Sequence, residues 1–439
     1  MEQLKDKLES SFIIFENELN GQAKTPIHKV RQKAFKTFEK KGFPTKRDEE
    51  WKYTNLRPIL KHDYRIFQKG ENVIDFKDIR RYFLSDMDTY KVVFVDGVFS
   101  SWLSETTHQR FDICTFNSMM QKSPEIVEEY FNKALPQEES LGAINTAFAH
   151  EGAFIRIKKG QTVDKPVEVV FFTTSQDKEV MMQPRNLVIV EENAEVQILE
   201  RHQSLSELPV FTNSVTEIFA HKSSRLYYYK VQNDNLEASL IDNTSVIQHE
   251  QSDVSIGTFS FGNKFVRNNL NIFLKGEHTE TNMDGITIIG DDQLVDHHTL
   301  VDHKIPNCHS SELYKGIYDG SAHGVFNGKV MVHPHAQKTN AFQENNNILL
   351  TDKASIDTKP QLEIYADDVQ CSHGCTIGQL DEDALFYLQS RGIPEKEGKA
   401  LLLYAFANDG LRNVKISGLR KKLNKQIAQK LGVNLDFEL

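Results

Sequence analysis

The spacing of apolar residues predicts two helices near the N-terminus. Apolar residues first recur at the three- and four-residue intervals of one helix face: Leu4, Leu8, Phe12, Phe15 and Leu19. A second helix is predicted from Pro26 to Gly42, because proline is favoured in the first helical turn. Further on, Asp96-Gly97 stands between two short apolar runs, which predicts a tight hairpin.

From about residue 152 to 370 the pattern changes to short segments of β-branched and aromatic residues between polar turns. The clearest segments are Ala153–Ile157, Val167–Phe172, Val188–Val190, Val196–Leu199, Leu226–Val231, Val254–Phe261, Leu270–Leu274 and Ile286–Ile289. So many short strands with few hairpin signals are typical of a sandwich, a barrel or a solenoid.

A β-solenoid is the favoured interpretation of this region. Small residues recur at corners after polar pairs, as in Glu192-Asn193-Ala194, His221–Ser224 and Lys353-Ala354-Ser355. Similar units return every ~20–30 residues, and stacked units of that size bury a continuous core. A sandwich remains the alternative on periodicity alone.

The tail returns to helical spacing. Asp381 can cap a helix that ends at Ser390, Pro394 opens a second helix through Ala407, and a basic amphipathic helix is predicted over 417–431. The pattern therefore predicts three domains: a helical and mixed domain (1–150), a β core (151–378) and a helical domain (379–439).

Charge and composition exclude several classes of protein. The 439 residues carry a formal net charge of -10, so the chain has no overall attraction for nucleic acid or anionic lipid. No apolar run approaches the ~20 residues that cross a bilayer, and the first residues do not resemble a signal peptide. With only four cysteines, the chain is expected to lie in a reducing compartment, the cytoplasm.

Motifs of nucleotide hydrolysis are missing. The nearest approach to a phosphate-binding loop, Gly324 to Val330, has the wrong glycine spacing and no hydroxyl for magnesium. The chain is therefore not expected to hydrolyse ATP by itself, and a non-catalytic scaffold is the favoured class.

Half of the sixteen histidines fall in one band: His297, His298, His303, His309, His323, His333, His335 and His373. Imidazole is a good ligand for iron and zinc. His333 and His335 lie two apart, so on a strand they would face the same side. No four ligands have the spacing of a structural zinc site, so no tightly bound metal is expected. The band leaves open a metal-dependent β-helix or cupin-like enzyme, and equally a set of hydrogen-bonded, metal-free histidines.

A second constellation is Cys371-Ser-His373-Gly-Cys375. On an extended segment Cys371, His373 and Cys375 project from one face, which offers up to three ligands to a metal. The preceding acidic pair favours a cation but raises a thiol pKa, so a reactive thiolate is not implied. A turn with buried cysteines is the alternative.

The stretch from Asp291 to Phe406 resembles the SufB/SufD family of iron–sulfur cluster assembly scaffolds. The matching motifs follow one another in order: Asp296-His297, His303, Ser310-Ser311, Tyr314-Lys-Gly316, Val325-Phe-Asn-Gly-Lys329, Gln343 to Leu350, Lys359 to Ile364, Ala366 to Gly374, Leu385 to Leu388 and Ser390 to Ile393. Glu50-Trp51-Lys-Tyr-Thr54 is similar to the family's N-terminal part. The Cys-Ser-His-Gly segment and a length near 440 resemble the SufD branch of the family more than SufB.

The resemblance implies a right-handed parallel β-helix core with helical N-terminal and C-terminal domains. It also implies assembly with SufB through the β-helix edge and with two copies of the ATPase SufC. A free sheet edge would also allow a homodimer of the isolated chain.

Site residues follow from the same resemblance. Cys371 and His373 match positions implicated in cluster formation near the interface with SufB, where iron or a nascent cluster would be held transiently. Cys375 stands where many relatives have alanine, and we interpret it as an incidental small buried residue rather than an extra ligand. The C-terminal region would dock SufC through Leu385, Phe386, Leu388, Arg391, Tyr404 and Phe406.

Overall fold

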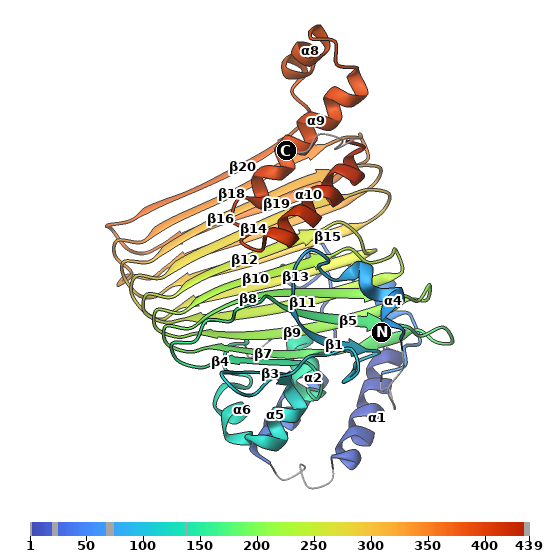
Figure 1. Cartoon of the computed structure of the whole chain (residues 1–439), viewed down its shortest axis with the longest axis vertical. Helices are drawn as coiled ribbons and strands as arrows, with labels where there is room; N and C mark the ends of the chain where they lie inside the picture. The colour runs from blue at the N-terminus through green and yellow to red at the C-terminus, as the bar shows by residue number, and fades with distance from the viewer. Residues whose placement is uncertain (1, 20–24, 67–73, 137–138, 434–439) are drawn as a thin grey trace.

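The computed structural model describes residues 2–19, 25–66, 74–136 and 139–433. Most strands in this part of the chain belong to two long parallel sheets that wind around a common core (Figure 1). The strands of the first sheet, in spatial order, are β2 (Val98–Phe99), β1 (Tyr90–Val95), β5 (Val167–Thr173), β8 (Glu195–Ser204), β10 (Arg225–Gln232), β12 (Asp253–Ser260), β14 (Glu280–Ile289), β16 (His309–Tyr318), β18 (Asn340–Leu349) and β20 (Gln370–Gly378).

The second sheet is built in the same way from the strands that alternate with these in sequence. Its order is β19 (Ser355–Ile364), β17 (His323–Val332), β15 (Leu294–His303), β13 (Phe265–Leu274), β11 (Ala238–Gln248), β9 (Val210–Ala220), β7 (Arg185–Val190), β4 (Ala153–Ile157) and β3 (Phe111–Thr115), with β6 (Val180–Met182) beside β9. Successive strands therefore alternate between the sheets, so the chain forms a parallel β-solenoid of about eight turns.

The parallel pairing confirms the solenoid and overturns the sandwich. One turn returns the chain to the same place after 26 residues where Asn243 pairs with Asn269, and after 33 where Phe154 pairs with Leu187. The expected ~20–30 residues was thus slightly short. Apolar side chains such as Ile198, Val246 and Ile272 point inward and are fully buried, because alternate residues of each strand face the core.

The predicted corners are also confirmed. Asn193 and Ser223 have φ values of 57° and 55°, the left-handed conformation that reverses the chain direction within a few residues. The small residues that follow, Ala194 and Ser224, are 1% and 0% exposed, because each corner packs against the corners above and below.

The N-terminal region covers the first turns of the solenoid (Figure 1). Its helices are α1 (Glu2–Glu18), α2 (Pro26–Lys41), α3 (Arg57–Leu60), α4 (Phe76–Ile79), α5 (Phe116–Lys122), α6 (Pro124–Tyr130) and α7 (Ser140–Ala147), with 3-10 turns at Glu49–Trp51 and Arg80–Tyr82. The predicted hairpin is present, since β1 and β2 pair across Asp96 and Gly97, which both have positive φ. β1 and β3 extend the two sheets, so this region and the core share their hydrogen bonds.

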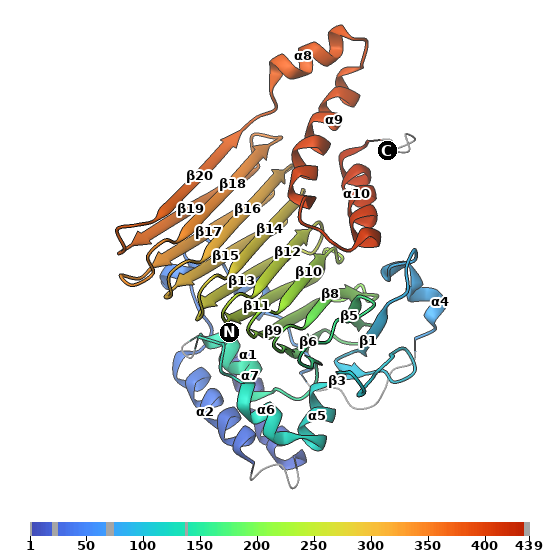
Figure 2. The ribbon, with the colours of Figure 1, turned by 60° about the vertical axis from the view of Figure 1, so that its left-hand side comes forward.

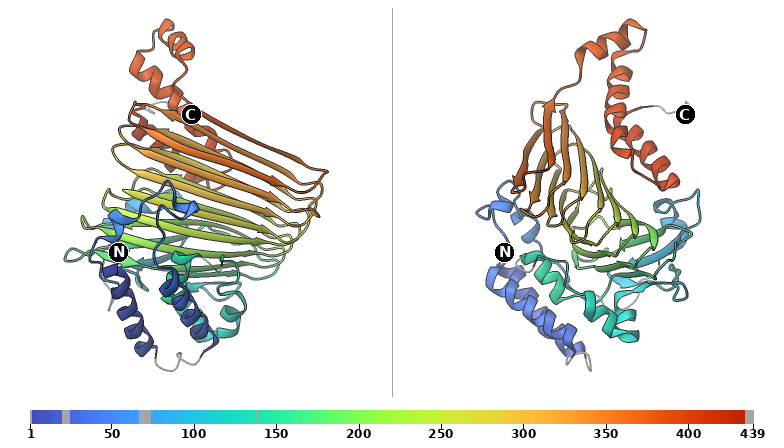
Figure 3. Two further views of the ribbon diagram at one scale, coloured as in Figure 1. Left: turned by 180° about the vertical axis from the view of Figure 1, so that it is seen from behind. Right: turned by 90° about the vertical axis from the view of Figure 1, so that its left-hand side faces the viewer.

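The C-terminal helices α8 (Glu382–Ser390), α9 (Glu395–Asn408) and α10 (Ser417–Leu431), with a 3-10 turn at Asp409–Leu411, match the three helices predicted for the tail. α9 and α10 lie on the outer face of the first sheet, where Leu403, Leu419 and Leu423 join its apolar side chains. α8 stands beyond the last turn (Figures 2 and 3). No helix in the described residues is long and apolar enough to span a membrane.

Candidate functional site

The two ends of the solenoid differ. The first turns are covered by α1, α2 and α7, whereas the last turn, β19 and β20, has no strand beyond it in the described chain (Figure 3). Inward residues that are buried in earlier turns are therefore half-exposed or exposed here. Ile364, Tyr365 and Ile377 are 39%, 61% and 50% exposed. This open end combines two free strand edges with uncovered apolar side chains.

The Cys-Ser-His-Gly-Cys segment forms β20 at this open end. Cys371, His373 and Cys375 share one face of β20, as the sequence predicted. Cys371 pairs with Ala341, which is fully buried in the core, so this face points inward. Cys371 is half-buried, and burial raises the pKa of its thiol. His373 is exposed, because no further turn covers it in the part of the chain that the structure describes.

The expectation that Cys375 is buried is wrong. It is exposed rather than buried, and its Sγ lies 3.3 Å from Thr358 Oγ1 on β19. The segment is a strand, so the alternative of a turn with buried cysteines is wrong. The physical reason is the missing next turn, which leaves inward positions of β20 open to solvent.

These side chains do not form a ready metal site. Residues two apart on a strand are separated by about 6.6 Å, too far for three of them to bind one ion. In the described residues, no three His, Cys, Asp or Glu side chains are grouped closely enough to hold a metal. Any ion at Cys371 and His373 would therefore need further ligands from elsewhere.

The histidine band is divided between the two faces of the sheets. His297 and His303 point inward, and burial lowers the pKa of each to about 4, so both are neutral at physiological pH. His297 bonds Thr287 at 2.9 Å, and His303 bonds Ser310 at 2.9 Å. These two are hydrogen-bonded core residues.

His333 and His335 do not share a strand face. β17 ends at Val332, and the two residues lie in the turn that follows, so the expectation of a common side is wrong. His333 Nε2 instead pairs with Asp302 Oδ1 at 2.7 Å, while His335 is exposed. Pro334 between them ends the strand, because proline has no N–H for the ladder.

A network that sequence reasoning missed lies on the outer face of the second sheet. His298 Nε2 is 3.0 Å from Asp296 Oδ1, and its Nδ1 is 3.2 Å from Glu50 Oε2. Burial opposes protonation of His298, but the two carboxylates outweigh it and raise its pKa. Glu50-Trp51 and Asp296-His297 are separate motifs in the sequence, and this network brings them together in the fold.

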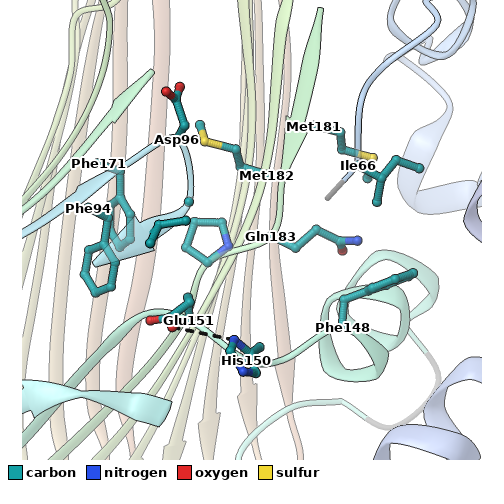
Figure 4. A pocket seen from close by; sticks show the side chains of 13 residues that line it. Ile66, Phe94, Asp96, Phe148, His150, Glu151, Phe171, Met181, Met182 and Gln183 are labelled. Atoms are coloured by element: carbon teal, nitrogen blue, oxygen red, sulfur yellow. Dashed lines mark ion pairs between the residues drawn. The ribbon is translucent and has the colours of Figure 1, made fainter. Parts of the chain in front are cut away.

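The N-terminal end holds a separate cavity of about 280 Å³, lined mainly by Phe94, Phe148, Phe171, Met181 and Met182 (Figure 4). His150 and Glu151 pair across 3.5 Å in its wall. Burial lowers the pKa of His150 to about 4 and raises that of Glu151 to about 7. Between these values both groups are neutral.

The residues predicted to dock a partner through the C-terminal helices fall into two groups. Leu385 and Leu388 pack on Gly398 of α9, and Tyr404 and Phe406 pack against the apolar cluster on the first sheet. Phe386 is 71% exposed, and Arg391 is exposed as well. Tyr387, which the sequence analysis did not single out, is 57% exposed and stacks with Arg391. The outward face of α8 is therefore Phe386 and Tyr387, with Arg391 directly after the end of the helix.

Comparisons with known proteins agree with this architecture. Residues 171–406 match the model of the SufBD core domain of the SUF system for FeS cluster assembly, and residues 3–169 match the SufBD N-terminal region. An iron–sulfur cluster assembly SufBD family protein of Synechocystis is 32% identical, covering 88% of this chain and 87% of that protein. The iron–sulfur cluster assembly protein SufD of Escherichia coli is 29% identical, with 89% and 90% covered, and that of Bacillus subtilis is 27% identical, with 70% and 71% covered.

The two domain models together span nearly the whole described fold, from α1 through α9. The chain belongs to the SufBD family of SUF-system iron–sulfur cluster assembly proteins.

Proposed function

We propose that this chain is a SufD-type scaffold subunit that pairs with SufB, binds the ATPase SufC and contributes to iron acquisition and cluster formation at the seam with SufB. The observation that carries the proposal is the open last turn, which puts Cys371 and His373 beside two free strand edges. Two observations support this proposal: the chain belongs to a family of cluster assembly proteins, and a thiol and an imidazole lie at an unpaired edge.

The open end is suited to another β-structure. β19 and β20 run for 10 and 9 residues with one side unpaired, and long free edges readily accept a further strand. In this proposal SufB, the other member of the SufB/SufD family, supplies the strand edge that pairs with it. In its absence a second copy of this chain is the next best match, which is the basis for a homodimer.

Pairing at this seam would complete the ligand set. One soft thiol and one imidazole are too few for iron, and the facing subunit would add the others. Iron or the nascent cluster is then cargo that is gathered at the seam and released, rather than a resident cofactor of the isolated chain.

SufC docking is assigned to the outward face of α8, which projects beyond the solenoid. A nucleotide-driven movement of SufC would act on α8 and α9 and, through the apolar contacts of α9, on the turns next to the seam. Such a movement has an effect only if SufC contacts this chain differently in its two nucleotide states. ATP hydrolysis belongs to SufC in this scheme.

Two experiments test the proposal. Tagged chain expressed in its native cell should bring down SufB and SufC, and failure to recover either would contradict the partnership. In a reconstituted complex, His373→Ala should lower cluster formation at least tenfold while all subunits remain assembled. His278→Ala, an exposed histidine in the turn between β13 and β14, is the matched control and should have no effect. Unchanged cluster formation in His373→Ala would defeat the site assignment.

A further inference from the structure

Three inward side chains follow one another on successive turns at the open end. Glu312 on β16 pairs with Gln343 on β18, and Gln343 pairs with His373 on β20. Neighbouring strands lie about 4.8 Å apart, so each side chain is stacked on the next. Glu312 and Gln343 are 3% and 1% exposed, whereas His373 ends the row at the surface.

The amide of Gln343 is held in one orientation. Its Nε2 donates to Glu312 Oε2 at 2.7 Å. Across the core, a Cβ on Gly328 would lie 2.4 Å from this nitrogen, so the missing side chain at Gly328 makes the space that the amide fills. Gly328 belongs to the Val-Phe-Asn-Gly-Lys motif, and this contact gives a physical reason for glycine there.

The other end of the same amide has no partner. Gln343 Oε1 is buried and accepts no hydrogen bond from any residue that the structure describes. Leaving a buried acceptor unpaired costs about 1–3 kcal/mol, so its retention in a well-packed core needs an explanation. With Nε2 turned toward Glu312, the free oxygen is the part of the amide available to the next residue in the row, His373.

A histidine that binds a metal usually donates its second ring N–H to a fixed acceptor, which sets the tautomer and the ring orientation. We propose that Gln343 is a positioning residue for His373. Its Oε1 accepts the N–H of one ring nitrogen, so that the other nitrogen presents its lone pair to iron at the open end, and Glu312 fixes the amide that does this. The inference rests on the proposed function, because it assumes that His373 receives iron.

The test is a double-mutant cycle in the reconstituted complex with Fe²⁺ as the titrant. Gln343→Met removes the acceptor with little change of volume. It should raise the Fe²⁺ concentration for half-maximal cluster formation about tenfold, which is the usual effect of losing such a partner. In a His373→Ala background the same change should have no further effect, because coupled residues are not additive.

Two further variants separate positioning from general damage to the core. Gln232→Met removes a similarly buried amide, 3% exposed and four turns away on β10, and should leave the iron dependence unchanged. Glu312→Gln keeps an acceptor for Gln343 Nε2 and should stay within about threefold of the parent, since the orientation of the amide survives.

If Gln343→Met fails to assemble, Gly328→Ala takes its place, because the added methyl displaces the amide while Gln343 itself remains. Equal losses in the His373 and His373→Ala backgrounds would overturn the positioning role. If His373→Ala alone changes nothing, the proposed site itself fails, so the two failures are distinct.

Discussion

Arg267 and Asp296 face each other on neighbouring strands of the second sheet, with Nη1 2.7 Å from Oδ2. The same Nη1 donates to the backbone oxygen of Glu50 at 2.7 Å, and the guanidinium lies 4.1 Å from the ring centre of Trp51. Burial opposes ionisation of Asp296, but Arg267 and His298 together lower its pKa. This buried pair fastens the Glu49–Trp51 turn of the N-terminal region to the solenoid.

Removal of Arg267 should therefore destabilise the protein strongly. Arg267→Ala leaves His298 as the remaining ion-pair partner of the buried Asp296, and breaking one side of a buried pair costs about 3–5 kcal/mol. The measurement is the free energy of unfolding in denaturant at pH 7. Arg225→Ala is the matched control, since its pair with Glu195 at 3.6 Å is largely exposed and should contribute under 1 kcal/mol. Equal effects of the two variants would contradict the fastening role.

Glu312 predicts a pH dependence of stability. Burial raises its pKa to about 7, so the folded state holds a proton that the unfolded chain loses near pH 4.3. The folded state is thus penalised progressively as pH rises from about 4.3 to 7. Glu312→Gln removes this penalty, and its gain in unfolding free energy should be about 2.5 kcal/mol larger at pH 8 than at pH 5.

The control for this pH series is Glu344→Gln, on the adjacent strand but exposed. Its stability relative to the parent should not vary with pH. A Glu312→Gln curve parallel to that of the parent from pH 5 to 8 would show that the carboxyl group titrates normally.

Substitutions on the outward face of α8 should weaken SufC binding without lowering the stability of the chain. Phe386→Ala combined with Tyr387→Ala should weaken capture of SufC at least tenfold, because large exposed aromatic side chains are typical interface anchors. Unfolding of the isolated chain should change by less than about 0.5 kcal/mol. Leu388→Ala should instead lower the stability of the isolated chain more than it weakens SufC capture, since Leu388 packs on Gly398 and supports the helix pair. Pull-down with purified SufC and thermal unfolding distinguish the two effects.

The free edge of β20 predicts the effect of a single proline. The N–H of Gln370 bonds Thr339 in the β18 direction, and donors alternate along a parallel strand. The N–H of Ile377 therefore points to the open side, whereas that of Thr376 points to β18. Ile377→Pro should weaken pairing with SufB or with a second copy about tenfold, the equivalent of ~1.4 kcal/mol.

Thr376→Pro is the counterpart, because it removes a hydrogen bond within the chain and should lower the thermal midpoint instead. Light scattering after size exclusion reports self-pairing, and pull-down reports SufB. Unaltered pairing in Ile377→Pro would show that the edge is not the contact.

The sequence by itself determined the local elements. The interval of Leu4, Leu8 and Phe12, the cap at Asp381 and the turn at Asp96-Gly97 all acted through residues near in the chain, and their helices and hairpin are present. The alternation of Cys371, His373 and Cys375 likewise followed from strand geometry alone. The expectation for His333 and His335 failed because it assumed that the strand continues past Pro334, whereas β17 ends at Val332.

Only the tertiary structure decided what each strand meets. Burial of Cys375 depends on whether another turn covers it, and the orientation of Gln343 depends on Glu312 and Gly328, which lie one turn away or across the core. The meeting of Glu50 with His298 spans 248 positions of the chain. Periodicity along the chain fixes which way a side chain points, but its neighbours are set by how the turns stack and where the stack ends.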